Sequence, residues 1–459
     1  FTNLEEESDV VTKKYDIINE DITFKELLEN IYKLRNKEQI DELWYDVYEW
    51  YRNNPKWAKI LEENMEGLKY TNIPKKIKKE NIERLYGKTL STSVSKLEQY
   101  KRCPFSYYLQ YGLKLKPKEE LKIQSFNTGT FMHETIDRFF GYTNENGINL
   151  AEISEEDIEK IVAQIIDEEL ELTKNYIFKA TVKYKVLVRR LKKIVSKALK
   201  YIIQTLIYSD FNIYGTEVAF GQKGKYKPIV IQLEDGKQIE INGKIDRIDI
   251  AKQKDGNYLR IIDYKSSTKN IDLNEVYAGL QIQLLTYSDA VCNEEDFIPA
   301  GVFYFSLIEQ MIKANKKISE EEIEANIKKN FKMKGLIVAD VKIIKMNDNS
   351  LTSGSSKLVP AAINKDGGII EKWTNGVNKE DFDVLQKYIY KTIKEISTEI
   401  LGGNIELKPF YKKGKTPCEY CDYKSICSFD CRKKDNQYNY IENLTKDDII
   451  RKMSKKIEI

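Results

Sequence analysis

The chain has 459 residues, of which 41% are hydrophobic and 32% charged, and its formal net charge is +3. These values indicate a soluble globular protein of two or three domains, and no apolar run reaches the roughly 18 residues that a membrane span needs, so no membrane association is expected. The balanced charge does not by itself identify a nucleic-acid partner, and no signal-peptide pattern opens the chain, which favours a cytoplasmic location. Because the first residue is Phe rather than Met, we expect a piece of a longer protein.

Residues 1–90 are predicted to be helical and charged. Apolar positions recur with three- and four-residue spacing in "TFKELLENIYKL" and "DELWYDVYEWYRNNPKWAKILEENM". Further along, Ser95 followed by Glu98 fits a helix capping box, and Pro104 after Cys103 fits the start of a second helix. A helix through "GTFMHETIDRFFGY", an acidic helix over about 155–173 and a basic helix over about 183–203 follow.

From Glu217 the pattern changes to short β-rich runs. The segments "TEVAFG", "PIVIQL", "QIEINGKIDRIDIA" and "YLRIIDYKSS" are separated by the turn sequences "EDGKQ" and "KQKDGN". A helix over about 273–291, a strand "AGVFYFSL" and a long helix that ends near "LGGN" come next. Strands flanked by helices predict an α/β fold with a mixed central sheet.

Two carboxylates on neighbouring strands are candidates for a metal site. Asp263 and Lys265 share one strand face because they are two residues apart, and both charges are costly to bury without a partner. Asp246 lies on the preceding strand, which the "DGN" turn folds back beside Asp263, whereas Asp249 points to the opposite face. Mg²⁺ binds such carboxylates together with a backbone carbonyl such as that of Tyr264. The ion activates water for attack on a phosphodiester, and Lys265 is placed to neutralise the developing charge.

Four of the six cysteines lie close together near the end of the chain, with C-x2-C-x5-C spacing through Cys418, Cys421 and Cys427. Clustered cysteines in a protein without an export signal favour metal ligation over disulfides. The fourth ligand is either the nearby Cys431, which predicts a structural zinc site, or the distant Cys103, which predicts a [4Fe–4S] cluster. The spacing leaves both alternatives open.

The motifs "GTFMHETID", "GKIDRID", "IIDYKSS" and "QIQLLTY" resemble, in sequence and in order, those of RecB-type nucleases of the PD-(D/E)xK superfamily. The resemblance implies a catalytic set of His133, Asp246, Asp263 and Lys265. It implies that Mg²⁺ or Mn²⁺ is bound by His133, Asp246, Asp263 and the carbonyl of Tyr264. It also implies that Gln283 and Tyr287, one helical turn apart, lie on the DNA-binding side of the catalytic site. An imidazole ligand favours Mn²⁺ over Mg²⁺.

The segment "YKRCPFSYYLQYGL", followed much later by C-x2-C-x5-C, resembles the iron–sulfur staple of AddB-type nuclease domains. In that family one cysteine precedes the nuclease core and three follow it. The resemblance therefore implies that the [4Fe–4S] cluster is bound by Cys103, Cys418, Cys421 and Cys427, which leaves Cys431 and Cys292 free. Such a staple closes a long loop and contributes mainly to folding.

A basic helix is a candidate for DNA contacts. Eight Lys or Arg residues and no acid lie between Lys183 and Lys200. Apolar residues share one helical face, which leaves Arg189, Arg190 and Lys193 on a cationic face for phosphates. A solvated helix face in a Lys-rich protein explains the same pattern equally well. The segment "KPFYKKGK", whose Phe410 or Tyr411 could stack on a base, is a weaker candidate.

The resemblance covers roughly Leu90 to Cys431. It implies three parts: a helical tail of a helicase-like domain over 1–90, a RecB-like nuclease domain with its staple over 91–435, and a charged C-terminal tail over 436–459. The implied function is a metal-dependent exonuclease that acts on single-stranded DNA ends, with an AddA-type helicase–nuclease subunit as partner in double-strand break repair and recombination. A stand-alone Cas4-type iron–sulfur exonuclease is one alternative, which the chain length and the helical N-terminal region disfavour. A non-catalytic DNA-binding scaffold is another, which the presence of all four motif residues disfavours.

Overall fold

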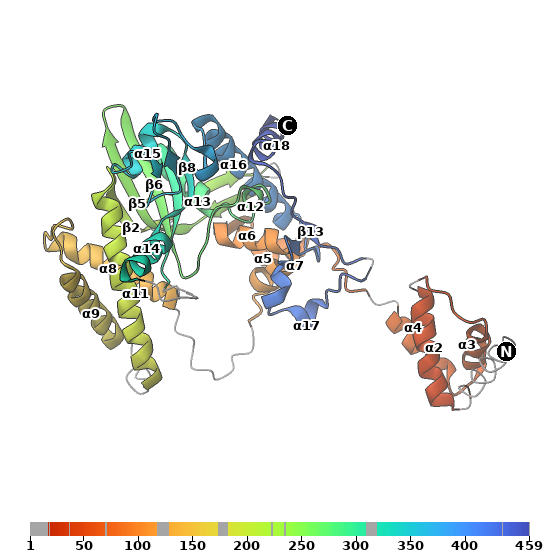
Figure 1. Ribbon diagram of the computed structural model, residues 1–459. Coiled ribbons are helices and arrows are strands. Elements are labelled where there is room, and N and C mark those ends of the chain that lie inside the picture. The colour runs from red at the N-terminus through yellow and green to blue at the C-terminus, as the bar shows by residue number, and fades with distance from the viewer. Residues whose placement is uncertain are drawn as a thin grey trace, which may run out of the picture. The chain divides into compact units, whose positions relative to one another are not determined.

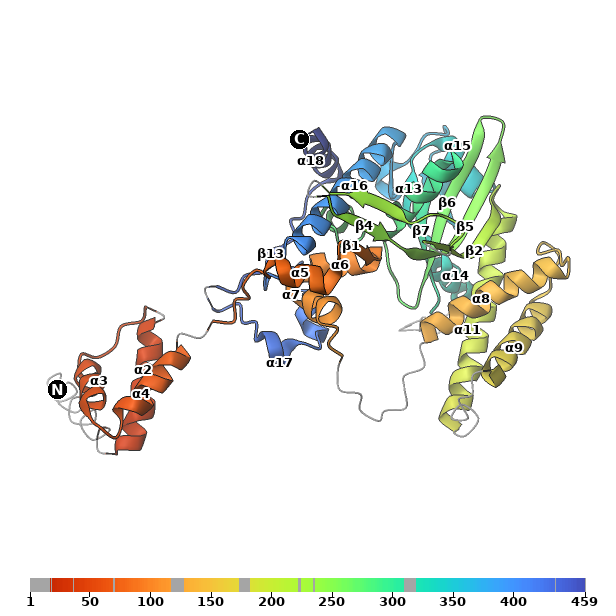
Figure 2. The same ribbon diagram turned by 180° about the vertical axis from the view of Figure 1, so that it is seen from behind.

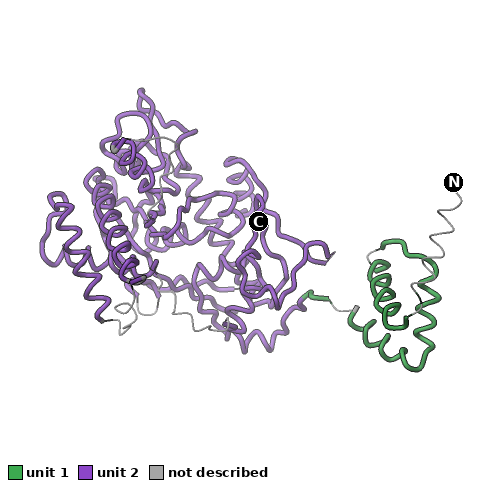
Figure 3. The backbone as a smooth tube through the Cα atoms, turned by 60° about the horizontal axis from the view of Figure 1, so that its bottom comes forward, with its two compact units in different colours: residues 1–73 green, residues 74–459 purple. Residues whose placement is uncertain are grey.

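The computed structural model describes residues 17, 19–35, 37–68, 71–116, 128–172, 182–221, 224–233, 236–308, 319–433 and 435–458. The backbone forms two compact units, Phe1–Ile73 and Pro74–Ile459, which Figure 3 colours separately. The division expected at residue 90 falls inside the second unit. The reason is that β1 (Thr89–Thr92) pairs with β4 (Gln238–Ile241) and that Ile82 is buried in the core of this unit.

The described part of the first unit contains three helices, α2 (Glu20–Arg35), α3 (Leu43–Asn53) and α4 (Ala58–Leu68). Their apolar sides meet around Leu27 and Tyr51, which are both almost completely buried. This packing follows from the three- and four-residue spacing of apolar residues, because that spacing places them on one side of each helix.

The second unit is built on a mixed sheet of six described strands in the order β11–β8–β7–β6–β5–β2 (Figure 1). Strand β6 is parallel to β7 and β8 is parallel to β11, whereas the other neighbours are antiparallel. The strands are β2 (Asn212–Phe220), β5 (Gly243–Gln253), β6 (Gly256–Lys265), β7 (Ile298–Ser306), β8 (Lys334–Val338) and β11 (Gly376–Val377). The predicted α/β fold with a mixed central sheet is confirmed.

A smaller sheet, in the order β1–β4–β3, lies beside the large one (Figure 2). Its third strand is β3 (Ile229–Gln232), which is antiparallel to β4. The run "QIEINGKIDRIDIA", which was expected to be a single strand, is therefore divided between two sheets. The division falls at Asn242, whose backbone N–H donates the last hydrogen bond of β4 to β1, at the carbonyl of Thr92, before β5 begins at Gly243 in the large sheet.

Helices cover the large sheet, with α8, α9 and α11 grouped on one side and α12, α13, α16 and α18 gathered together elsewhere (Figure 1). The helices of this unit are α5 (Lys79–Tyr86), α6 (Val94–Arg102), α7 (Pro104–Tyr107), α8 (Thr128–Glu145), α9 (Glu155–Leu172), α11 (Val182–Ile207), α12 (Leu273–Tyr277), α13 (Gln283–Glu295), α14 (Glu320–Phe331), α15 (Val341–Asn347), α16 (Lys379–Leu401), α17 (Lys424–Cys427) and α18 (Lys446–Glu458). Short elements complete it: η1 (Tyr108–Gly112), β9 (Gly354–Ser355), β10 (Ala362–Ile363), η2 (Glu371–Trp373), β12 (Phe410–Tyr411), η3 (Pro417–Tyr420) and β13 (Asn439–Tyr440). Within the described ranges, no helix has the length and apolar character needed to cross a membrane.

Two predicted elements differ in the structure. The helix expected over about 273–291 is broken into α12 and α13, because Gly279 adopts a left-handed backbone conformation with φ of 76° between them. The charged tail expected over 436–459 contains a packed helix, α18. Its Ile449 and Met453 are four residues apart, so they lie on one face and are buried against the rest of the unit.

Candidate active site

The hairpin of β5 and β6 brings the two predicted carboxylates together. Arg247 on β5 pairs with Ile262 on β6, and this antiparallel register places Asp246 opposite Asp263 on the same face of the sheet. Asp246 Oδ2 accepts a hydrogen bond of 2.8 Å from the backbone N–H of Tyr264. The Asp246 carboxylate is therefore held in place by the strand that carries Asp263.

His133 on α8 lies against these strands. Its Nδ1 atom is 3.3 Å from Asp246 Oδ2, and its ring meets the Tyr264 ring edge-on with 5.5 Å between the centroids. Burial acts to lower the pKa of His133, but the hydrogen bond to Asp246 and the charges of Glu217 and Asp263 raise it above its ordinary value. The imidazole is thus surrounded by carboxylates, which is the environment of a metal ligand.

Glu217 on β2 belongs to the same group, and the sequence reasoning missed it. One ligand atom from each of His133, Glu217 and Asp246 lies within 4.8 Å of the other two. Glu217 Oε2 pairs with Lys244 Nζ. Its buried Oε1 is 3.9 Å from His133 Nδ1 and has no hydrogen-bond partner among the described residues. A buried carboxylate oxygen without a donor is available to a cation.

The place of Glu217 follows from strand pairing. Its neighbours Thr216 and Val218 pair with Arg247 and Ile245 of β5, the two residues that flank Asp246. Glu217 itself has a left-handed backbone conformation, with φ of 49°, which is uncommon for a residue other than Gly, Asn or Asp. Such strain is found where the surrounding structure fixes a functional side chain. The signal available in the sequence was an acid within the β-rich run "TEVAFG".

Asp263 and Lys265 form an ion pair on the sheet face shared with Asp246. Asp263 is almost completely buried, and burial together with the charge of Asp246 raises its pKa to about 6, against the opposing effect of Lys265. Asp263 lies outside the compact group formed by His133, Glu217 and Asp246, and its carboxylate is engaged by Lys265 instead. A fourth possible ligand and a cation thus adjoin the group.

Gln283 and Tyr287 lie on the first turns of α13. Gln283 Nε2 donates a hydrogen bond of 3.1 Å to the Tyr287 hydroxyl. Burial raises the pKa of Tyr287, and the charges of Asp263 and Asp246 add to this effect. The buried Glu98 of α6 accepts hydrogen bonds from the backbone N–H groups at the start of α13, so the capping box expected between Ser95 and Glu98 does not form.

Asp249 belongs to a buried ion-pair network with two arginines. Its carboxylate accepts two hydrogen bonds of 2.6 Å from Arg247 and one of 2.8 Å from Arg260, and all three side chains are buried. Asp249 and Asp246 point to opposite faces of the sheet, as their three-residue separation predicts.

The donor set fits a divalent cation of the Mg²⁺ or Mn²⁺ kind. An imidazole nitrogen and two carboxylates lie close together, a third carboxylate adjoins them, and one carboxylate oxygen is buried without a donor. Carboxylates suit both ions, and the imidazole improves the fit to Mn²⁺.

A family model described as the PD-(D/E)XK nuclease superfamily matches residues 91–428, and one described as the fifth domain of the ATP-dependent helicase/deoxyribonuclease AddB matches residues 14–67. The first match covers most of the chain and includes the whole ligand group. The chain belongs to the PD-(D/E)XK nuclease superfamily.

Relatives named as a subunit of an ATP-dependent helicase/deoxyribonuclease are similar over nearly all of the chain. The protein of Clostridium novyi (strain NT) is 37% identical over 454 residues, which are 96% of this chain and 40% of that protein. The protein of Caldanaerobacter subterraneus subsp. tengcongensis is 38% identical over 426 residues, which are 92% of this chain and 37% of that protein. The chain spans about two fifths of the length of the curated relatives that it matches.

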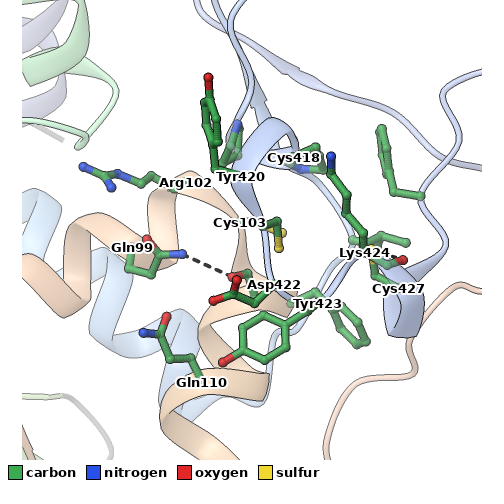
Figure 4. Close-up of a pocket in the computed structure, with 17 residues that line it drawn as sticks. Gln99, Arg102, Cys103, Gln110, Cys418, Tyr420, Asp422, Tyr423, Lys424 and Cys427 are labelled. Carbon is green, nitrogen blue, oxygen red and sulfur yellow. Dashed lines mark hydrogen bonds between the residues drawn. The ribbon is translucent and has the colours of Figure 1, made fainter. Parts of the chain in front are cut away.

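In this member of the superfamily, Cys103, Cys418, Cys421 and Cys427 line one cavity of about 440 Å³. Figure 4 shows Cys103, at the end of α6, facing the segment that carries Cys418 and Cys427. Burial, together with the neighbouring Cys418 and Cys421, raises the pKa of Cys103 to about 12. This thiol stays protonated at neutral pH unless a metal centre displaces its proton. Cys431 is exposed and does not line the cavity.

The basic helix is α11, on which Arg189, Arg190 and Lys193 are exposed. Other cations of this helix face the acidic helix α9. Lys192 Nζ is 2.6 Å from Asp167 Oδ1, and Lys200 pairs with Glu155. Arg189, Arg190 and Lys193 are not members of the ligand group around Asp246, so DNA contacts by these three residues stay a prediction.

Proposed function

We propose that the second unit is a divalent-metal-dependent deoxyribonuclease that degrades single-stranded DNA from its ends. The observation that carries the proposal is the group of His133, Glu217 and Asp246 beside the Asp263–Lys265 pair, in a chain that belongs to a nuclease superfamily. The name of the relatives, which includes a deoxyribonuclease, supports DNA as the substrate.

Each residue of the site has a role in this proposal. His133, Glu217 and Asp246 would hold Mg²⁺ or Mn²⁺, with Asp263 and the carbonyl of Tyr264 as further ligands. When bound, the ion would stabilise the charge that develops on the phosphate and would activate the attacking water. Lys265 orients that water and adds a positive charge beside the phosphate. Gln283 and Tyr287 position the DNA backbone at the mouth of the site.

We also propose that Cys103, Cys418, Cys421 and Cys427 bind a [4Fe–4S] cluster that holds the two ends of the nuclease domain together. Their common cavity and the exclusion of Cys431 from it support this assignment. In a zinc site the sulfur atoms lie about 3.8 Å apart, because Zn–S bonds of about 2.3 Å point to the corners of a tetrahedron. Among the described residues, no three cysteine sulfurs come within 4.8 Å of one another, which favours the larger cluster.

The setting of the enzyme is part of the proposal. The match of residues 14–67 to the AddB fifth domain supports a helicase-like region before the nuclease and an AddA-type subunit as partner in break repair. Arg189, Arg190 and Lys193 would contact DNA phosphates on the outside of the domain. A DNA-repair role agrees with the cytoplasmic location expected from the sequence.

The test is a nuclease assay with the purified chain, single-stranded DNA and Mn²⁺. We expect Asp263→Ala to lower the rate more than about 100-fold, because loss of even a group that only supports a metal ligand costs 10–100-fold. Asp255→Ala, at the turn of the same hairpin, is the matched control and should cleave like wild type. Equal rates for wild type and Asp263→Ala would exclude catalysis by this site and leave a DNA-binding scaffold.

A further inference from the structure

A cavity of about 480 Å³ lies between α6, the segment after β6 and the segment that leads into the cysteines. Its lining includes three cations: Arg102, Lys269 and Lys415. In the part of the chain that the structure describes, none of the three has a salt-bridge partner. Like charges gathered in one cavity repel one another, so this arrangement becomes favourable when a polyanion occupies it.

The carboxylates of the cavity do not cancel these charges. Glu275 lines it, and its charge is partly offset because Glu275 Oε1 lies 2.8 Å from Lys412 Nζ. Lys412 also pairs with Asp272. Glu419 is the other acid of the lining and is exposed to solvent. Three cations against two carboxylates leave the lining with one excess positive charge.

Lys269 connects the cavity to the catalytic residues. Its Nζ atom lies 4.8 Å from the centre of the Tyr304 ring, and Lys265 Nζ lies 5.8 Å from the centre of the same ring. Tyr304 pairs with Asp263 in the register of β7 and β6. Burial lowers the pKa of Lys269, and Glu98, Lys265 and Asp263 are among the charges that act on it. Lys269 is thus placed to bind a phosphate next to the one that Lys265 faces.

Two aromatic side chains line the same cavity, Phe410 and Tyr420. Phe410 is half-buried, whereas Tyr420 is 91% exposed. Figure 4 shows the side chains of Tyr420 and Arg102 pointing away from Cys103. Cations that follow a groove, with an aromatic ring free to stack on a base, are the usual construction of single-strand binding sites.

Two further cavities share lining residues with this one. Arg102, Pro417 and Tyr420 also line the cysteine cavity. Lys269 and Lys415 also line a larger open cavity of about 970 Å³. The three cavities therefore adjoin one another, and Lys269, which shares the Tyr304 ring with Lys265, brings them beside the Asp263–Lys265 pair. A row of adjoining cavities suits an extended ligand better than a single small molecule.

We propose that this cavity, lined by Arg102, Lys269, Lys415, Gln281, Phe410 and Tyr420 and called the strand groove below, binds single-stranded DNA next to the cleaved phosphate. Lys269, Lys415 and Arg102 hold backbone phosphates beyond the cleavage position, and Tyr420 stacks on a base. The inference rests on the nuclease function proposed above for its substrate class, and it adds which residues hold the strand.

The test measures binding without cleavage. A fluorescent oligothymidylate is titrated with the full chain by anisotropy, with Ca²⁺ and without Mg²⁺ or Mn²⁺, over a range of KCl concentrations. We expect the magnitude of the slope of log affinity against log salt concentration to fall by about 0.7 in each of three variants, Lys269→Ala, Arg102→Ala and Lys415→Ala. The reason is that each phosphate contact on a single strand releases about 0.7 of a counterion. Tyr420→Ala should weaken binding about tenfold at fixed salt with an unchanged slope, and Tyr420→Phe should bind like wild type.

Lys365→Ala is the matched control, because it removes the same charge from the turn after β10, outside the three cavities. It should keep the wild-type slope, and the thermal unfolding midpoint of every variant should match wild type, which separates lost contacts from lost folding. Wild-type slopes in the three cation variants would overturn the strand groove. Displacement of the probe by polyglutamate in preference to unlabelled oligothymidylate would overturn it in favour of an acidic protein surface.

The two proposals fail in different ways. If the chain cleaves DNA with Mn²⁺ but the variants keep the wild-type salt dependence of DNA affinity, the nuclease proposal stands and the strand-groove proposal is wrong. If DNA binding depends on the groove residues but no DNA is cleaved, the strand-groove proposal stands and the nuclease proposal is wrong. If the chain neither binds nor cleaves DNA, both proposals are wrong.

Discussion

Glu98 accepts a hydrogen bond of 3.0 Å from the backbone N–H of Gln283, although 185 positions separate the two residues in the chain. The same Oε1 atom accepts a second bond, of 2.8 Å, from the N–H of Ile282. A buried carboxylate thus closes the N-terminus of α13, where exposed N–H groups and the helix dipole stabilise negative charge. Glu98 orients the helix that carries Gln283 and Tyr287.

We therefore expect Glu98→Ala to lower the cleavage rate about 10–100-fold, the usual cost of losing a group that orients a functional residue. The affinity for Mn²⁺ should stay at the wild-type value, because Glu98 does not belong to the ligand group. Single-turnover kinetics and calorimetric Mn²⁺ titration measure the two quantities. Glu98→Gln keeps an acceptor oxygen and should fall between Glu98→Ala and wild type. A loss of Mn²⁺ binding in Glu98→Ala would contradict a positioning role.

Glu217→Gln tests the residue that the sequence reasoning missed. Replacing a carboxylate by an amide keeps the shape of the side chain but removes the charge that faces His133, so Mn²⁺ should bind at least about tenfold more weakly. Lys244→Ala is the matched control, because it removes the partner of Glu217 and leaves the carboxylate in place. Calorimetric titration with Mn²⁺ measures the affinity of both variants. Equal Mn²⁺ affinity in wild type and Glu217→Gln would show that Glu217 is no ligand.

Metal binding should depend on pH around 6. The pKa of Asp263 is raised to about 6 by burial and by Asp246, so below this pH Asp263 carries a proton that a cation must displace. His133 also has a raised pKa and must lose its proton to act as a ligand. The apparent Mn²⁺ affinity should therefore fall as the pH is lowered through about 6.

Calorimetry in buffers of different ionisation enthalpy counts the protons that the metal releases. Near pH 6, Asp263→Asn should release fewer protons than wild type and show a flatter pH dependence, because one titrating group is removed while His133 and Glu217, whose pKa values are also raised, remain. The same proton release in both proteins would mean that Asp263 is ionised before the metal binds.

Asp249 should matter for stability rather than for chemistry. Asp249→Ala leaves Arg247 and Arg260 buried without their shared carboxylate, and breaking a buried ion pair in this way costs about 3–5 kcal/mol. Asp255→Ala removes an exposed pair with Lys342 and a hydrogen bond from the Tyr258 hydroxyl, and should cost about 1 kcal/mol. Urea unfolding followed by circular dichroism measures both. A neutral Asp249→Ala would show that water or neighbouring groups satisfy the arginines.

Local patterns predicted the strand pairing beneath the candidate site. The Asp263–Lys265 spacing fixed a shared strand face, and the "DGN" turn fixed the pairing that places Asp246 opposite Asp263. The acidic and basic helices also lie where their apolar spacing placed them, as α9 and α11. Each of these features depends on residues that are close in sequence.

Features that depend on distant pairing were not predicted. The position of Glu217 depends on β2 pairing with β5, while the chain between them forms strands of another sheet. The role of Glu98 was misread, because a capping box is a local pattern whereas its true partners lie on α13. Neither contact has a periodic signature in the sequence.

The contacts of the segment around α6 have a consequence for synthesis on the ribosome. The Tyr100 hydroxyl donates to the carbonyl of Asn404 at 3.3 Å, and the carbonyl of Leu115 accepts from the Tyr423 hydroxyl at 3.0 Å, across 304 and 308 positions of the chain. At about 5–20 residues per second, the nascent segment waits on the order of 15–60 s for these partners to emerge. The segment lacks these two partners throughout that interval, which gives chaperones time to bind the nascent chain there.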